Sequence, residues 1–134
     1  MEEELYFDNS ATLRIFSETK IDFEEIEKTL GITPTSKHKK GERRGAKTPP
    51  YKHDMWSLES GLKEEESLEK HLLALWGILK PHKEYLLTLK ETAKIDVFCG
   101  YRSNNHIAGV DLSHQALELF SELKIDFSLS IITT

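Results

Sequence analysis

The chain has 134 residues, of which 38% are hydrophobic and 31% charged, with a formal net charge of −5. This length supports one domain with a real hydrophobic core, so we expect a single domain over residues 1–134. No apolar run approaches the roughly 20 residues that span a bilayer, and the acidic start MEEELYFDNS lacks the features of a secretory signal. Together with a single cysteine, these features predict a cytoplasmic protein without a membrane partner.

Charge is unevenly distributed along the chain. Between Lys37 and Asp54 there are seven Lys or Arg residues and two acids, a local net charge of +5, whereas the remaining residues hold 11 bases and 21 acids. A nucleic-acid-binding domain normally presents a basic face on a neutral or basic body. Because the body here is acidic, the composition disfavours nucleic acid as a partner and leaves an anionic ligand or another protein.

The first 31 residues predict a strand followed by a helix. Residues 10–17, SATLRIFS, alternate apolar and polar side chains, which is typical of a strand with one buried face. In the next stretch Asp22 is a good N-cap, Phe23, Ile26 and Leu30 form an apolar stripe, and Gly31 supplies the C-terminal stop.

Residues 33–54 are different, because they hold three of the four prolines and few apolar residues. We expect a long basic loop, which in a compact domain tends to be functional or mobile. MWSLES, residues 55–60, resumes strand character. A helix over residues 64–79, interrupted at Pro81 and continued over 82–91, comes next, then a strand over 94–101, a helix from Ser113, and a strand over 125–132.

This order predicts an α+β protein. We expect a four-stranded, largely antiparallel sheet with helices packed on one face, on a ferredoxin-like split βαβ plan. The helix over residues 64–79 is then an extra central helix.

The basic loop is the first candidate functional site. Its glycines would let the backbone approach a phosphate or carboxylate, and its cations would supply charge. The spacing of a P-loop is absent, and a solvated loop kept soluble by its charges is the simpler alternative. The candidate contact residues in this loop are Lys39, Lys40, Gly41, Arg43 and Arg44.

A second group of candidates would close a pocket beside that loop. Trp56 could be a stacking platform where the loop re-enters the sheet, although a tryptophan at a strand start is more often core. The polar turn at residues 102–106 offers Arg102 and Asn104 as hydrogen-bonding groups, yet an Asn-rich turn needs no function to exist.

Catalytic and metal-binding signals are weak. The six histidines show no HxH or HExxH spacing, the GxSxG motif is absent, and Cys99 lies on the apolar side of a predicted strand. We therefore expect no cofactor, no metal and no catalytic residue.

Several stretches together are similar to an uncharacterised bacterial domain family, DUF4279. They are ATLRI, LGITPT, KKGE, MWSLES, LEKHLLALWGILKP and LSHQALELFSELKIDFSLSI, which cover nearly the whole chain. The family's last strand is typically more acidic than Ser128-Leu129-Ser130 here. The resemblance implies a small bacterial α+β domain and no particular activity; an immunity-type role beside a toxin is an analogy only.

Two functions follow as expectations. The first is a non-catalytic binding or protein-interaction module that uses the basic loop as its contact surface, with the acidic body as the competing surface. The alternative is a small enzyme or small-anion sensor with a pocket between the basic loop and the turn at residues 102–106.

Overall fold

The computed structural model describes residues 4–105 and 109–134, and within them five strands form one mixed sheet in the order β2-β3-β1-β4-β5. The strands are β1 (Phe7–Ser17), β2 (Ser36–His38), β3 (Asp54–Glu59), β4 (Lys94–Ser103) and β5 (Leu129–Thr133). The helices are α1 (Phe23–Leu30), α2 (Leu68–Leu79), the 3-10 helix η1 (Lys80–His82), α3 (Lys83–Leu89) and α4 (Glu118–Leu123).

The α+β class is confirmed, but the sheet has five strands instead of the predicted four. The fifth strand, β2, lies inside the segment predicted to be a loop. Three of the four strand pairings are antiparallel, and β5 pairs parallel to β4. β2 escaped prediction because three polar residues, Ser-Lys-His, are too few to show a period of two. β5 is parallel because α4 carries the chain back across the sheet between the two strands.

The order from β1 to β4 is strand, helix, strand, strand, helix, strand. In this order β3 lies between β1 and β2 and is antiparallel to both, as in a split βαβ arrangement. The helix α2, predicted to be an extra central element, is therefore the second helix of this plan. The additions are α4 and β5, which extend the sheet beyond β4.

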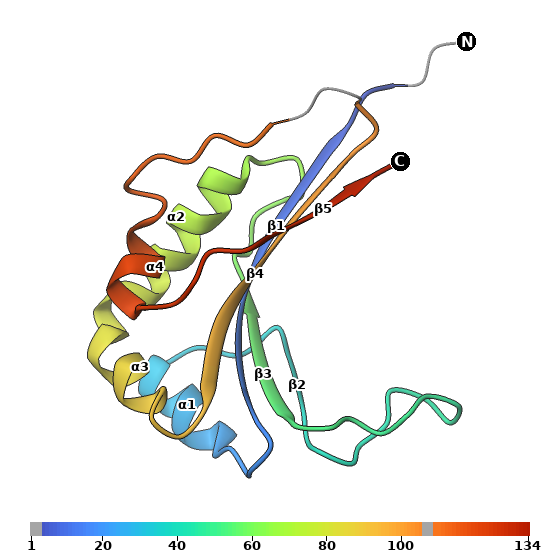
Figure 1. Ribbon diagram of the computed structural model, residues 1–134. Helices are drawn as coiled ribbons and strands as arrows, with labels where there is room; N and C mark the ends of the chain where they lie inside the picture. The colour runs from blue at the N-terminus through green and yellow to red at the C-terminus, as the bar shows by residue number, and fades with distance from the viewer. Residues whose placement is uncertain (1–3, 106–108) are drawn as a thin grey trace.

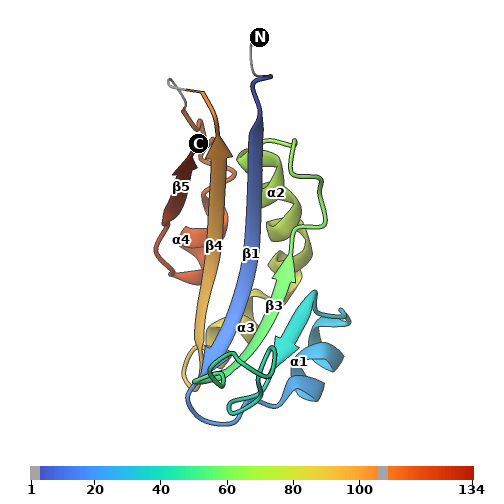
Figure 2. The same ribbon diagram turned by 90° about the vertical axis from the view of Figure 1, so that its right-hand side faces the viewer.

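All the helices lie on one face of the sheet, and the other face is open (Figures 1 and 2). The longest strand, β1, is central and alternates buried residues such as Leu13 and Ile15 with half-buried polar ones. α1 begins and ends as predicted, since the Asp22 carboxylate accepts the Glu25 N–H at 3.1 Å and Gly31 adopts a left-handed conformation with φ of 66°.

The last strand is shorter than the predicted 125–132. Only Leu129–Thr133 is a strand, and residues 124–128 run beside the sheet without pairing with it. Lys124 ends α4 in a left-handed conformation, and the Phe127 ring packs edge-on against Phe120 of that helix at 5.2 Å. The segment is thus held by the helix layer, which polar and apolar alternation cannot reveal.

No helix in the described part of the chain is long and apolar enough to cross a membrane.

Candidate functional site

Residues 36–59 form a long hairpin, here called the basic hairpin. β2 and β3 pair antiparallel, and beyond them the pairing continues, since Gly41 N–H donates to the Tyr51 carbonyl at 2.9 Å and Tyr51 N–H to the Glu42 carbonyl at 2.8 Å. Gly41 has φ of 92°, a conformation that favours glycine. Of the predicted loop over residues 33–54, Ser36–His38 form β2 and Asp54 begins β3. Residues 39–53 contain no helix or strand and project from the end of the sheet as a loop whose two arms are hydrogen-bonded to each other (Figure 1).

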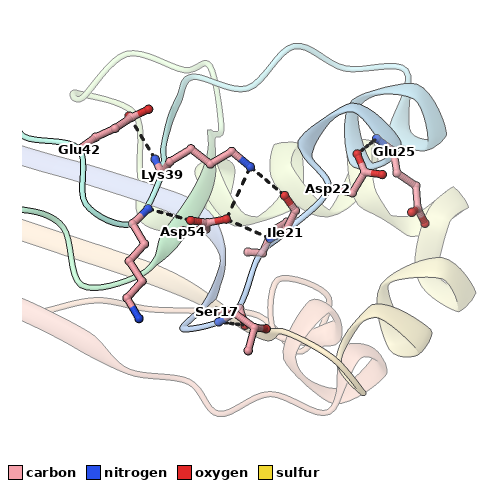
Figure 3. A network of polar contacts seen from close by, with 9 residues as sticks. Ser17, Ile21, Asp22, Glu25, Lys39, Glu42 and Asp54 are labelled. Atoms are coloured by element: carbon pink, nitrogen blue, oxygen red, sulfur yellow. Dashed lines mark hydrogen bonds and ion pairs between the residues drawn. The ribbon is translucent and has the colours of Figure 1, made fainter.

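The hairpin root consists of Lys39, Lys40 and Asp54 with the residues they contact before α1. The Asp54 side chain is buried, and its two oxygens accept the N–H groups of Lys40 at 2.7 Å and Ile21 at 3.0 Å. The Lys39 ammonium lies 3.6 Å from the same carboxylate (Figure 3). One buried carboxylate thus ties both arms of the hairpin to the turn that leads into α1.

The Lys39 side chain lies against the body of the protein, although 39% of it stays exposed. Its ammonium donates to the Ile21 carbonyl at 3.0 Å and lies 4.0 Å from the centre of the Phe23 ring, a cation–π arrangement. Burial of Asp54 raises the pKa of that carboxyl, but the hydrogen bonds from Lys40 and Ile21 and the charge of Lys39 outweigh burial, so the pKa of Asp54 is lowered. The Asp54 carboxyl is therefore ionised at neutral pH.

The hairpin tip, residues 43–47, is arranged in the opposite way. Arg43 donates one hydrogen bond, to the Thr48 carbonyl at 3.3 Å, and the tip is closed by Gly45 N–H donating to Thr48 Oγ1 at 2.9 Å. Within the described residues, no hydrogen bond or ion pair engages the side chains of Arg44 and Lys47, and all three cations of the tip are exposed. The tip therefore presents positive charge that the protein does not neutralise itself.

Aromatic rings pack against one another beside the root. His38 stacks on Tyr51 with ring centres 3.5 Å apart and an interplanar angle of 8°, and His53 lies 5.4 Å from Phe16 of β1. Burial, and then the neighbouring His53, lower the pKa of His38. Uncharged at neutral pH, His38 can stack on Tyr51 without desolvating a cation.

Trp56 does not contribute to an accessible pocket, and that candidate role is wrong. Its side chain is completely buried at 0% exposure, on the helix side of β3. Trp56 is the largest fully buried side chain of the core, so it anchors the hairpin to the body and cannot stack on a ligand.

Arg102 and Asn104 lie at the other end of the sheet from the basic hairpin. The register places Arg102 opposite Asp8 on β1, whereas Asp54 at the hairpin root is opposite Ser17. Those nine residues of β1 correspond to roughly 30 Å. The predicted pocket between the basic loop and the turn at residues 102–106 is therefore wrong, although residue 106 itself falls outside the described residues.

Asn104 has a structural role of its own, whereas Arg102 has no partner within the described residues. The Asn104 side chain accepts the Tyr6 N–H at 3.0 Å and donates to the Glu4 carbonyl at 2.9 Å, so it fixes the chain that leads into β1. Arg102 is exposed on the open face and makes no hydrogen bond or ion pair within the described residues.

Cys99 has no environment for nucleophilic chemistry. It is buried at 1% exposure, and burial raises the pKa of its thiol to about 11, so the thiol is protonated at neutral pH. Among residues 4–105 and 109–134, no cluster of three or more His, Cys, Asp or Glu side chains could hold a metal ion.

Sequence reasoning missed Asp54, which organises the whole root. A signal was present, because Asp54 is one of only two acids among the residues from Lys37 to Asp54 and directly precedes a strand rich in apolar residues. Such a lone acid is a natural internal counter-ion for neighbouring lysines.

Comparison with known proteins identifies a family but no activity. The model of the family described as "Domain of unknown function (DUF4279)" matches residues 4–134. No curated protein and no solved structure matches the chain.

Proposed function

The chain belongs to the DUF4279 family, and from the geometry of the basic hairpin we propose that it is a non-catalytic protein-interaction module of the bacterial cytosol. In this proposal the hairpin tip is the contact surface, with Arg43 and Arg44 as its principal cations. The partner is a protein with an acidic surface.

The observation that carries the proposal is the division of charge along the hairpin. The Lys39 ammonium lies 3.6 Å from the Asp54 carboxylate, which neutralises it. The charge of Lys39 therefore stabilises the hairpin root. Within the described residues, Arg44 and Lys47 are exposed and lack an acidic partner. Glu42, the acid nearest to them in sequence, accepts a hydrogen bond from Lys39 N–H at 3.2 Å. Hydrogen bonds across the arms hold the exposed cations on a hairpin, and such pre-organisation favours binding because less conformational entropy is lost when the hairpin docks.

The chemistry of the tip favours an acidic protein over a single-stranded nucleic acid. Stacking of bases needs accessible aromatic rings, but residues 43–47 contain none, and the nearest ring, that of Tyr51, is stacked on His38. An arginine can bind a carboxylate through two parallel hydrogen bonds. Such an interface therefore selects the orientation of the carboxylate as well as its charge.

The test is a quantitative pull-down with charge reversal at the tip. Arg43→Glu/Arg44→Glu should lose a specific partner that the wild type captures at physiological salt, with an unchanged melting temperature. Lys28→Glu/Lys63→Glu is the matched control, since both lysines are exposed and their side chains make no hydrogen bond or ion pair within the described residues. If the tip variant keeps every partner, or if the control loses the same ones, the tip is not the contact surface.

A small-anion sensor is the second candidate, because the root lies beside a hollow of about 840 Å³ lined in part by Lys20, Lys37 and Lys39. Lys37 is paired with Glu27 at 3.0 Å and Lys39 with Asp54, which leaves Lys20 to meet an anion. A thermal-shift screen separates the candidates: stabilisation by phosphate or a carboxylate that Lys20→Gln removes and Arg43→Glu/Arg44→Glu retains would favour the sensor.

A further inference from the structure

The sheet has an incomplete edge beside β4, at some distance from the hairpin tip. β5 pairs only with residues Cys99–Ser103 of β4, so the first half of that strand, residues 94–98, pairs with β1 alone. This unpaired stretch of five residues is roughly 17 Å long, about the length of a typical added strand.

The backbone direction shows which groups are left unpaired. Thr134 N–H donates to the Ser103 carbonyl at 3.1 Å, so Ser103 directs its polar backbone groups toward β5. Backbone direction alternates along a strand, so Ile95 and Val97 direct theirs the same way. Within the described residues, no backbone group bonds to the N–H or carbonyl groups of Ile95 and Val97, and the Val97 carbonyl accepts one weak side-chain hydrogen bond, from Cys99 Sγ at 3.9 Å.

A groove lies along this edge, here called the β4 groove. It has a volume of about 770 Å³ and lies between residues 94–98 of β4 and a second wall formed by residues 124–128 and the first two residues of β5. The segment between α4 and β5 can be followed in Figure 2. Its size is in the range of sites that bury a ligand.

The end of α4 holds the groove open. The Lys90 ammonium donates to the carbonyls of Leu123 and Lys124 at 3.0 and 2.7 Å, and the Phe127 ring rests on Phe120. These contacts keep residues 124–128 with the helix layer and away from β4. The space is therefore a built feature of the fold.

The lining of the groove has two kinds of surface. On the helix side the groove is lined by apolar residues, among them Ile125 and Leu129. Its exposed rim carries Lys94 and Lys124, whose side chains make no hydrogen bond or ion pair within the described residues.

Acids in the groove do not cancel this charge. The Asp96 carboxylate is engaged by Arg14 through two hydrogen bonds of 2.7 Å, and Asp126 is the other acid of the lining. The two rim lysines outnumber that remaining acid, so the groove has a positive charge balance.

We propose that the β4 groove binds an extended segment of a partner protein, with alternating apolar and acidic residues, as an added strand beside residues 94–98. Ile95 and Val97 would supply two N–H donors and two carbonyl acceptors to it. Because side chains alternate along a strand, one set would face Ile125 and Leu129 while the acidic set meets Lys94 and the rim. This site is separate from the hairpin tip, and its occupancy does not depend on the function proposed for the tip.

The test uses ¹⁵N-labelled full-length protein and the peptide acetyl-Glu-Val-Glu-Val-Glu-Val-amide, followed by NMR. We expect binding that shifts the Ile95 and Val97 amide resonances and slows their hydrogen exchange, while acetyl-Lys-Val-Lys-Val-Lys-Val-amide does not bind. Of two backbone-methylated peptides, one methylated on the glutamates and one on the valines, only one should lose binding, because alternate N–H groups of an added strand face β4.

Two variants locate the site. Lys94→Glu/Lys124→Glu should weaken binding of the Glu-Val peptide by about tenfold, and more at low salt, because two rim charges are reversed. Arg43→Glu/Arg44→Glu should leave it unchanged. No binding at about 1 mM peptide, or binding that the hairpin variant abolishes, would overturn the proposal. Shifts of Ile95 and Val97 that depend on protein concentration without peptide would also overturn it, since the occupant would then be a second copy of the chain.

Discussion

The root and the tip of the basic hairpin carry the same kind of side chain and use it in opposite ways. At the root, Lys39 lies against Phe23 and is neutralised by buried Asp54, so its charge holds the fold together. At the tip, Arg44 is exposed and has no acidic partner in the described structure, so its charge is available to another molecule. A run of basic residues is therefore not one structural unit, and the position of a single aspartate separates the lysine that stabilises the fold from the exposed arginine that has no acidic partner in the described structure.

The largest expected effect concerns the anchor of the hairpin in the core. Trp56→Ala removes a completely buried ring and should lower the free energy of unfolding by about 3–5 kcal/mol, because the cavity cannot collapse fully. Urea denaturation measures it, with Trp56→Phe as the milder variant that keeps a buried ring. A loss below 1 kcal/mol, by about the usual scale of surface changes, would show that Trp56 is not part of the core.

The next effect breaks the root itself. Asp54→Ala leaves the N–H groups of Ile21 and Lys40 and the Lys39 ammonium without their shared acceptor, and we expect a loss of about 3 kcal/mol. Asp126→Ala is the matched control at an exposed aspartate and should change stability by less than about 0.5 kcal/mol. Equal effects of the two variants would contradict the account of the root.

The root should also make stability depend on acid pH. The pKa of Asp54 is lowered in the folded state, so its contribution is complete above the ordinary carboxyl pKa of about 3.9 and is lost as pH falls through the lower folded value. The difference in unfolding free energy between wild type and Asp54→Asn should therefore stay constant down to about pH 5 and shrink between about pH 5 and pH 2. A difference that stays constant over this range would show that the carboxylate charge contributes nothing.

A smaller effect distinguishes two neighbouring lysines. Lys39→Met keeps the aliphatic stem but removes the contacts to Asp54, the Ile21 carbonyl and Phe23, which should cost about 1 kcal/mol because the ammonium is still partly exposed to screening solvent. Lys40→Met should be nearly neutral, since Lys40 uses its backbone N–H and not its ammonium. Identical melting temperatures for Lys39→Met and Lys40→Met would show that the Lys39 ammonium contributes no more to stability than the Lys40 ammonium.

The smallest effect on stability is expected at the tip. Arg43→Glu/Arg44→Glu should change the free energy of unfolding by less than about 0.5 kcal/mol, because only one hydrogen bond, at 3.3 Å, is lost. The same variant should have the largest effect on capture of an acidic partner. A strongly destabilised tip variant would mean that these arginines support the fold and could not be tested for binding.

Much of the fold could be predicted because its signals are local. The alternation in β1, the cap at Asp22, the stop at Gly31 and the break at Pro81 depend on residues close in sequence, and the structure confirms them. The family resemblance is likewise confirmed over residues 4–134.

What could not be predicted depends on contacts between distant residues. β2 has too few residues for a pattern, and it exists because β3 provides its partner. β5 begins only at Leu129, because the Phe127 ring packs against Phe120 and keeps the preceding residues beside α4. At the candidate site, the sequence shows the cluster of basic residues but not its division into root and tip. Nothing in the sequence indicates that Asp54 contacts Ile21, 33 positions earlier.

The most direct test of the central claim is amide hydrogen exchange at the hairpin, since the division into root and tip requires an ordered hairpin between them. We expect the amides of Gly41 and Tyr51, whose N–H groups cross the hairpin at 2.9 and 2.8 Å, to exchange more slowly than the tip amides of Arg44 and Lys47. Asp54→Ala should remove that protection while amides in β1 keep theirs. Equal, unprotected exchange from Lys39 to His53 in the wild type would contradict the account, because the cations would then belong to a mobile loop.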